Sequence, residues 1–410
     1  MQTELFSMLE PYVDGDWVYE QYPEFHPIAE YEQVQQQYLS RCRAFPGVRS
    51  VWTVGEIGVV GISDIDFVVG FADPLPNGDS ESLSIHRLDV PGPYIVLHQP
   101  LFLSESLLKE LFSWRYVSKA DCWYGDPTGI HVLPQEQLRI MKLVSLSDIF
   151  VQLQPRLLLR TLLSHRMHVR GTLCQINALK HTLSRYSGAT RLATTEWDSF
   201  ILEFVEFRRR WFELGTDRVD CLRTYVAQAI AMLFELMAAY HQALIDQAWF
   251  RPGNSKDMVH FLAPGYRTRF VARWDPRSAL AYTLSEWQRS REVSLELPLA
   301  FFEPLRSYLG LRGWLGSHVK QYLWPRGGVP DELWQEEFLI MAARDVRTRD
   351  AQVDFLLRSG LLWDDANYSS LGLWPVILTD RSLRGRLRRP YRQVRNWRKI
   401  MRILLAGANA

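Results

Sequence analysis

The chain has few of the residues that build disulfide scaffolds and zinc modules. Its 410 residues include only four cysteines, at positions 42, 122, 174 and 221. They lie far apart, which excludes the paired spacing of a zinc site and the dense pattern of a small secreted domain. Reduced thiols in a cytoplasmic protein are the plain interpretation.

Long apolar runs are also scarce. The first residues, MQTELFSMLEPY, have neither the basic start nor the apolar stretch of a secretory signal. The most apolar helical run, Tyr225–Tyr240, is shorter than a membrane span and contains Gln228 and Glu235. We therefore expect a buried bundle helix there, and a protein that is soluble or peripheral to the inner face of a membrane.

The chain as a whole has almost no net charge, but its C-terminal segment is strongly basic. The net charge is +1, whereas residues 381–410 contain ten Lys or Arg and no acid, which leaves −9 for residues 1–380. The body is expected to repel nucleic acid mildly, and the tail to attract polyanions. After Pro390 an apolar stripe with Trp397 recurs at helical spacing among the basic side chains.

A basic amphipathic helix of this kind suits an anionic membrane surface. It suits a protein partner, or the chain's own acidic body, equally well. RNA is less favoured, because the body is acidic and no RNA-binding signature accompanies the tail.

The sequence indicates a candidate catalytic site in residues 48–71, VRSVWTVGEIGVVGISDIDFVVGF. Two apolar runs, Val48–Val54 and Ile65–Phe71, flank a turn rich in glycine. If the second run is a strand, Asp64 and Asp66 lie on the same face of it. Two carboxylates so placed are oxygen ligands suited to Mg²⁺. The alternative is a pair of solvated acids at a strand edge or in an Asx turn.

Small residues surround the two aspartates. Gly55, Gly58, Gly61 and Ser63 leave room for the backbone to approach a phosphate closely. An ordinary turn accounts for Gly58 and Gly61 equally well.

The order Gly55-Glu56, a short gap, and Ser63-Asp64-Ile65-Asp66 resembles the signature of the DNA polymerase β-like nucleotidyltransferase superfamily. The resemblance covers roughly the first third of the chain. It implies a mixed sheet backed by helices, two Mg²⁺ ions held by the aspartates, and transfer of a nucleoside monophosphate from an NTP to a hydroxyl. The residues implied to lie against the nucleotide are Gly55, Glu56, Gly61 and Ser63.

Two departures from the family pattern stand out. Glu56 occupies the usual place of a serine, and a carboxylate repels a triphosphate unless a metal, Arg or Lys intervenes. The family also has a third acid on a later strand. Asp89, in a predicted strand Ser84–Val90, is the best match by position, and the next run, Tyr94–Phe102, offers only His98. Asp89 would bind one metal and deprotonate the acceptor hydroxyl.

The patterns predict an α+β nucleotidyltransferase-like domain over residues 1–145 and a helical bundle over 146–250. A mainly helical region, 251–380, and the basic tail, 381–410, complete the chain. The predicted helices are Ile28–Phe45, Ser104–Trp114, Asp148–Ser164, Thr172–Tyr186, Trp197–Leu214 and Val219–Phe250, and His260–Trp274 has strand character.

The bundle contains one further candidate site. His165 and His168, with Arg160, Arg166 and Arg170, form a basic cluster at helical spacing that could meet phosphates. A solvated helix face is the plainer interpretation. The two histidines, with only Cys174 nearby, are too few for zinc. Lys180 and His181 are a second candidate pair.

The sequence favours a Mg²⁺-dependent nucleotidyltransferase acting on a small-molecule acceptor. One alternative is a catalytically degenerate member of the fold that binds nucleotide or a regulatory partner, which Glu56 and the weak third acid favour. The other is a membrane-peripheral component of an envelope or polysaccharide pathway, suggested by the tail.

Overall fold

The structure is a computed structural model. It describes residues 2–72, 83–97, 100–108, 117, 119–130, 135, 138–139, 142, 146, 149–150, 154–247, 258–263 and 266–301. The helices predicted beyond residue 301 and the basic tail 381–410 lie outside the described residues.

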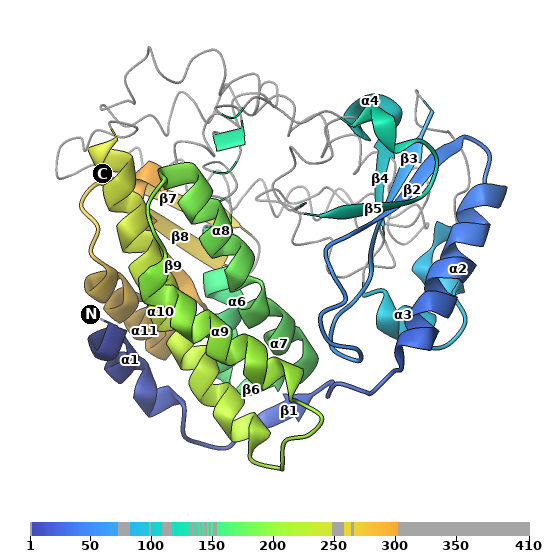
Figure 1. The fold of residues 1–410 in the computed structure, drawn as a ribbon. Coiled ribbons are helices and arrows are strands. Elements are labelled where there is room, and N and C mark those ends of the chain that lie inside the picture. Colours follow the sequence, from blue (N-terminus) through green and yellow to red (C-terminus); the bar gives the residue numbers. More distant parts are fainter. Residues whose placement is uncertain are drawn as a thin grey trace, which may run out of the picture. The chain divides into compact units, whose positions relative to one another are not determined.

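The described chain is α+β and divides into two compact units (Figure 1). Unit 1 comprises residues 2–23 and 142–301, and unit 2 comprises residues 24–141, as far as they are described. The first 23 residues therefore group with the helical unit, whereas the sequence assigned them to the N-terminal domain.

Unit 2 is built on a four-stranded mixed sheet with the order β4-β3-β2-β5. Strand β3 pairs antiparallel with β2 and parallel with β4, and β5 pairs antiparallel with the other edge of β2. The strands are β2 (Val48–Val54), β3 (Asp66–Phe71), β4 (Leu101–Ser104) and β5 (Ala120–Tyr124). The structure thus confirms the expected mixed sheet backed by helices, as a coarse α+β architecture.

Helix α2 (Ile28–Ala44) covers one face of this sheet (Figure 1). Its buried side chains recur at three and four spacing, and the helix ends just before Pro46-Gly47, where Gly47 has a φ of +87°. The cluster under the helix consists of Tyr31, Val34, Tyr38, Leu39 and Cys42 against Val51, Phe67, Val69 and Phe71. The other face carries Trp52 and Val68, packed with Leu108 of α4 (Glu105–Leu108).

Two strands predicted after the motif are wrong. Residues Ser84–Val90 contain a 3₁₀ helix, Ile85–Arg87, and the next run begins in the short helix α3 (Gly92–Ile95). Pro91 and Pro93 lack the N–H that a strand donates to its neighbour, so an extended ladder is disfavoured there. Among the described residues of this stretch a strand begins at Leu101, so the predicted run Tyr94–Phe102 coincides with β4 at its last two residues.

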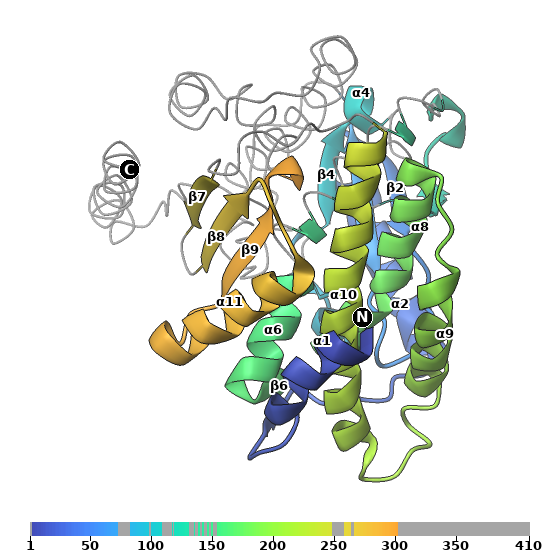
Figure 2. The ribbon, with the colours of Figure 1, turned by 90° about the vertical axis from the view of Figure 1, so that its left-hand side faces the viewer.

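Unit 1 is organised around the 29-residue helix α10 (Arg218–Asp246), which contacts α1, α6, α7, α8 and α11 (Figure 2). Every side chain from Ala229 to Met237 is buried. By length and composition α10 could cross a membrane, but 72% of its apolar 18-residue stretch is buried inside the protein. The surrounding helices are α1 (Gln2–Leu9), α6 (Gln154–Ser164), α7 (Val169–Asn177), α8 (Leu179–Thr190), α9 (Thr195–Arg209) and α11 (Pro276–Ser290).

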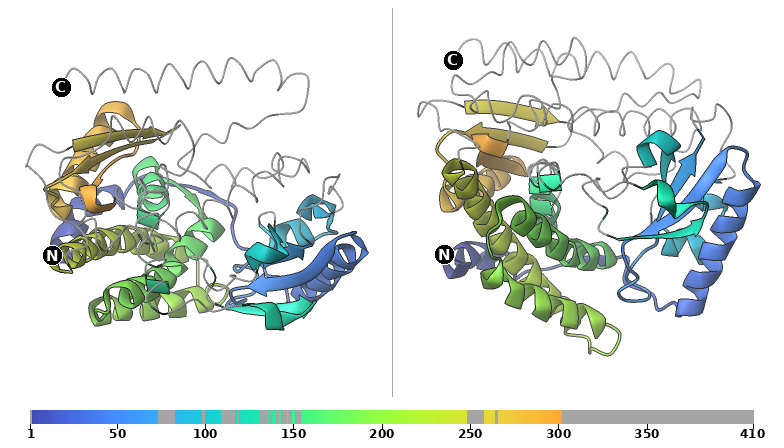
Figure 3. Two further views of the ribbon diagram at one scale, coloured as in Figure 1. Left: turned by 90° about the horizontal axis from the view of Figure 1, so that it is seen from above. Right: turned by 45° about the horizontal axis from the view of Figure 1, so that its top comes forward.

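Unit 1 also contains strands, of which the sequence indicated only the region His260–Trp274. Strands β7 (Met258–Ala263) and β8 (Tyr266–Val271) form a hairpin, and β9 (Ser294–Pro298) joins β8 in parallel after α11 (Figure 3). A second small sheet pairs β1 (Val18–Glu20) with β6 (Arg166–His168). The continuous helical pattern predicted around residue 165 is therefore interrupted by a turn and a strand.

Candidate functional site

The two predicted metal ligands lie where β3 begins. Asp66 is the first residue of β3 and pairs with Val54 at the end of β2, which in turn pairs with Ala120 at the start of β5. Asp64 precedes the strand by two residues, and both side chains are half-buried. The candidate site is thus at the edge of the sheet where one strand ends and its two neighbours start.

The side chain of Asp66 belongs to the sheet face opposite α2. Its in-register neighbours Val54 and Ala120 pack against the cluster of Trp52 and Val68, whereas the next residue, Phe67, packs under α2. Successive side chains of a strand point to opposite faces, so the Asp66 carboxylate leaves the sheet away from the helix. Asp64 lies before the first paired residue of β3. Its position on the same face as Asp66 therefore remains a prediction.

Two tyrosine hydroxyls hold the turn that leads into Asp64. The Tyr31 hydroxyl accepts a hydrogen bond from the Gly61 N–H at 2.7 Å and donates one to the Ser63 carbonyl at 2.8 Å. The Tyr94 hydroxyl donates to the Gly61 carbonyl at 2.6 Å and accepts from the Glu24 N–H at 2.7 Å. These tyrosines come from α2 and α3, so the helices behind the sheet fix the entry to the aspartates.

Gly61 and Ser63 are engaged within this turn. Gly61 is buried and has a φ of +79°, a conformation that favours glycine. Ser63 is 5% exposed, and its Oγ accepts a hydrogen bond from the Val59 N–H at 3.0 Å. Both residues, predicted to lie against a nucleotide, shape the turn instead of presenting these groups at its surface.

Gly55 and Glu56 are at the open end of β2. The Gly55 N–H donates to the Lys119 carbonyl at 3.0 Å, and a Cβ on Gly55 would meet no heavy atom within 4 Å. The Glu56 Oε1 lies 3.2 Å from the Lys119 Nζ. Both charged side chains are well exposed, 65% for Glu56 and 52% for Lys119. A cation therefore stands beside the carboxylate that departs from the family pattern.

Lys119 was not found from the sequence. It precedes β5, 63 residues after Glu56, and only the pairing of β5 with β2 brings the two together. A lysine directly before the run Ala120–Tyr124 was the one available signal. Its neighbours in space depend on the order of the strands, which a local pattern does not give.

Asp89 is not on a strand, and this prediction is wrong. It lies between the 3₁₀ helix and α3, is exposed, and is held by Gln37 of α2. The Gln37 amide donates to its carboxylate, and the Asp89 N–H donates back to Gln37 Oε1 at 3.1 Å. The strand geometry on which its role as a third acid was predicted is absent.

The sheet itself offers little in place of Asp89. The stretch before and within β4, residues 94–104, contains no acid, and His98 lies outside the described residues. Asp121 of β5 pairs with Thr53, in register with Phe67, and so lies on the α2 side of the sheet, opposite to Asp66. Within the described part of the chain, no group of three or more His, Cys, Asp or Glu is placed to hold a metal.

The donor set that remains suits one kind of ion. Asp64 and Asp66 supply carboxylate oxygens only, at a half-buried edge of the sheet. Mg²⁺ is bound in proteins by one or two carboxylates, with waters and substrate phosphates completing its shell. The pair therefore fits Mg²⁺ that arrives with a nucleotide better than a metal held by protein ligands alone.

The basic cluster predicted at helical spacing does not form. Arg166 is in β6 and pairs with Glu20 of β1, while Arg170 is buried in α7. His168 caps α7, its Nδ1 accepting a hydrogen bond from the Gly171 N–H at 2.9 Å, and burial lowers the pKa of its imidazole. The chain turns at His165, so these residues do not share one helical face.

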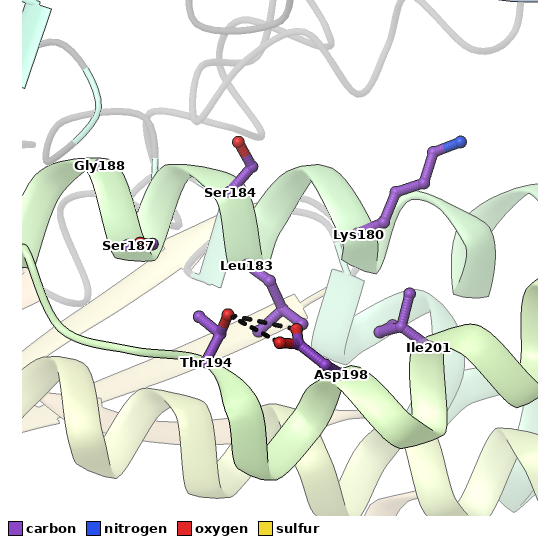
Figure 4. Close-up of a pocket in the computed structure, with 8 residues that line it drawn as sticks. All are labelled: Lys180, Leu183, Ser184, Ser187, Gly188, Thr194, Asp198 and Ile201. Atoms are coloured by element: carbon purple, nitrogen blue, oxygen red, sulfur yellow. Dashed lines mark hydrogen bonds between the residues drawn. The ribbon is translucent and has the colours of Figure 1, made fainter.

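Unit 1 has a groove of about 470 Å³ between α8 and α9 (Figure 4). The lining residues include two apolar side chains, one ammonium, one carboxylate and three hydroxyls. The Thr194 hydroxyl donates to the Asp198 carboxylate at 3.2 Å and fixes it within the groove. Of the predicted pair Lys180 and His181, Lys180 is among the lining residues, which are Lys180, Leu183, Ser184, Ser187, Gly188, Thr194, Asp198 and Ile201.

Comparison with known proteins gives no relative. No family model, no curated protein and no solved structure matches the chain. A functional assignment therefore depends on the residues of the chain and on their geometry.

Proposed function

We propose that unit 2 is a nucleotidyltransferase-like domain. It binds Mg²⁺ with a nucleoside triphosphate and transfers a nucleoside monophosphate to a hydroxyl of a small-molecule acceptor. The observation that carries the proposal is the position of Asp66. It opens β3 on the face away from α2 and is in register with Val54, directly before the Gly55 turn.

In this proposal each residue of the site has a separate role. Asp64 and Asp66 would hold Mg²⁺, which would neutralise charge on the phosphates and on the pyrophosphate that leaves. Gly55 leaves open space for phosphate oxygens beside the end of β2. Tyr31 and Tyr94 hold the turn from which the aspartates emerge, so that these carboxylates are in position before the nucleotide arrives.

A second candidate function, nucleotide binding without catalysis, is supported by the lack of a clear third acid. Residues 94–104, which lead into and form the strand next to β3, contain no acid, and Asp89 is bound to Gln37 in a loop. Such a domain would bind Mg²⁺ and nucleotide without a third carboxylate to take the proton of an acceptor hydroxyl. It would then be a nucleotide-binding or regulatory module.

Calorimetric titration of ATP, GTP, CTP and UTP with Mg²⁺ tests the part common to both candidates. The expected result is Mg²⁺-dependent binding of at least one nucleotide, lost in Asp64→Ala and Asp66→Ala. Asp121→Ala is the matched control, because Asp121 is an exposed acid on the opposite face of the same sheet. Absence of binding to folded parent protein, or an equal loss in Asp121→Ala, would refute the proposed site.

Transfer itself separates the two candidates. The bound nucleotide, labelled in its α-phosphate, is incubated with the protein and a low-molecular-weight cell extract. Label that moves to a new small molecule in the parent, and does not in Asp66→Ala, supports the transferase. Tight binding with no transfer over a range of extracts supports the non-catalytic module.

A further inference from the structure

Lys119 is at the same end of the sheet as the two aspartates. Asp66, Val54 and Ala120 form one row across three strands, and the hydrogen bond from Gly55 to the Lys119 carbonyl extends the β2–β5 pairing by one residue. Neighbouring strands are about 4.8 Å apart, so the β5 backbone is about 10 Å from that of β3. Alternation from Ala120 starts the Lys119 side chain on the α2 side of the sheet, opposite to Asp66, but its ammonium lies beside Glu56 at the open end of β2. A triphosphate that extends from Asp66 past the end of β2 would come within reach of this ammonium.

The partner that Lys119 has in this structure is easily exchanged. Its Nζ lies 3.2 Å from one oxygen of Glu56, and more than half of each side chain is exposed. Ion pairs of this kind are weak and are screened by salt. A triphosphate presents several negative charges to the same ammonium, and so competes effectively with a single carboxylate.

We propose that Lys119 binds the phosphates of the nucleotide, and that Glu56 holds its ammonium at the site until the nucleotide arrives. The inference rests on the proposed function, since it names the phosphate contact of the same site. It also explains why a carboxylate is compatible with a triphosphate site, because the ammonium beside it reduces the repulsion.

Two opposed substitutions test this. Lys119→Met keeps an unbranched side chain without its charge and is expected to weaken Mg²⁺–NTP binding about tenfold. Glu56→Gln removes the competing carboxylate and is expected to strengthen binding about threefold. Arg209→Met is the control, because Arg209 is an exposed cation paired with Glu206 in unit 1.

The double variant distinguishes competition from simple repulsion. If Glu56 competes for the ammonium, the gain from Glu56→Gln disappears when Lys119 is already methionine. If Glu56 only repels the phosphates, the same gain appears in both backgrounds, and the role proposed for Glu56 is overturned. Binding by the parent should also weaken with added salt more steeply than binding by Lys119→Met.

A second probe separates this inference from the function on which it rests. Inorganic triphosphate, titrated without metal, should bind the parent and should bind Lys119→Met about tenfold more weakly. Parental NTP affinity in Lys119→Met overturns the role of Lys119 and leaves the proposed function intact. Failure of the parent to bind any NTP, with triphosphate binding that still depends on Lys119, overturns the proposed function alone. Failure to bind either probe overturns both.

Discussion

The phenolic oxygen of Tyr31 lies 2.7 Å from the amide nitrogen of Gly61 and accepts its hydrogen bond. The same hydroxyl donates to the Ser63 carbonyl at 2.8 Å, and the Tyr31 side chain is fully buried. One side chain of α2 thus satisfies two backbone groups of the turn that delivers Asp64. The helix behind the sheet is thereby coupled to the turn from which the two candidate metal ligands emerge.

The first prediction concerns this coupling. Tyr31→Phe keeps the ring and leaves the buried Gly61 N–H and Ser63 carbonyl without that hydroxyl, which should cost about 1–3 kcal/mol of unfolding free energy. Thermal unfolding should begin several degrees lower, and Mg²⁺–NTP affinity should fall with it. Tyr38→Phe, on the same helix, loses a bond to the Leu83 carbonyl at 3.1 Å instead and should leave affinity unchanged. Parental affinity in Tyr31→Phe would contradict the coupling.

The second prediction concerns the left-handed backbone conformation of Gly61. At a φ of +79° an alanine is strained, so Gly61→Ala should destabilise unit 2 by about 1–2 kcal/mol. Gly129→Ala is the comparison, because a Cβ there would meet nothing within 4 Å and its φ is not in the left-handed region. Urea midpoints measure both. Equal midpoints would mean that the turn does not depend on the conformation of Gly61.

The outcome at these residues shows what the sequence could predict. Strand β2 has the predicted bounds and α2 ends within one residue of its predicted end, because alternation, helical spacing and the Pro46-Gly47 stop are all local signals. The strand predicted at Asp89 does not form, because Pro91 and Pro93 lack the N–H groups that a strand donates. Lys119 was missed for another reason, since its place depends on which strands pair.

Unit 1 shows the same limit. The helical spacing on both sides of His165 was correct, but the residues between α6 and α7 pair with β1, nearly 150 positions earlier in the chain. A three-residue strand has no periodicity of its own to detect. The basic residues of that segment were therefore assigned to a helix face that does not exist.

A third prediction follows from His241 of α10, which is buried and lies edge-on to Trp274 with ring centroids 6.3 Å apart. Burial lowers the pKa of His241 to about 4. Between that value and the unfolded pKa, about 6.5, the unfolded chain binds more protons than the folded one. Stability supplied by the neutral imidazole is therefore present above about pH 6.5 and is lost as the pH falls towards 4.

The comparison of parent with His241→Gln isolates this effect from that of other groups. Urea unfolding at pH 7, 5.5 and 4 should show the parent losing up to about 3 kcal/mol more than the variant over this range. Glutamine does not titrate, so its remaining pH dependence belongs to other groups, including His168. Parallel pH profiles for the two proteins would show that His241 does not titrate differently on folding.

The last prediction uses a thiol to locate the nucleotide. Cys42 lies on the buried face of α2 in unit 2, and burial raises its pKa to about 12, whereas Cys221 of unit 1 is exposed. A thiol reagent should label Cys221 rapidly, and Cys42 only when α2 opens from the sheet. A ligand that binds the closed form of unit 2 makes that opening rarer, by about a hundredfold at one hundred times its Kd.

Mass spectrometry of labelled peptides gives the rate at each cysteine in one experiment. With Mg²⁺ and the tightest-binding NTP, labelling of Cys42 should slow greatly while that of Cys221 stays constant. In Asp66→Ala the nucleotide should protect neither thiol, because the metal ligand that couples nucleotide to unit 2 is missing. Protection of Cys221 alone, in a protein that binds NTP by calorimetry, would place the nucleotide in unit 1 and contradict the assignment of Asp64 and Asp66.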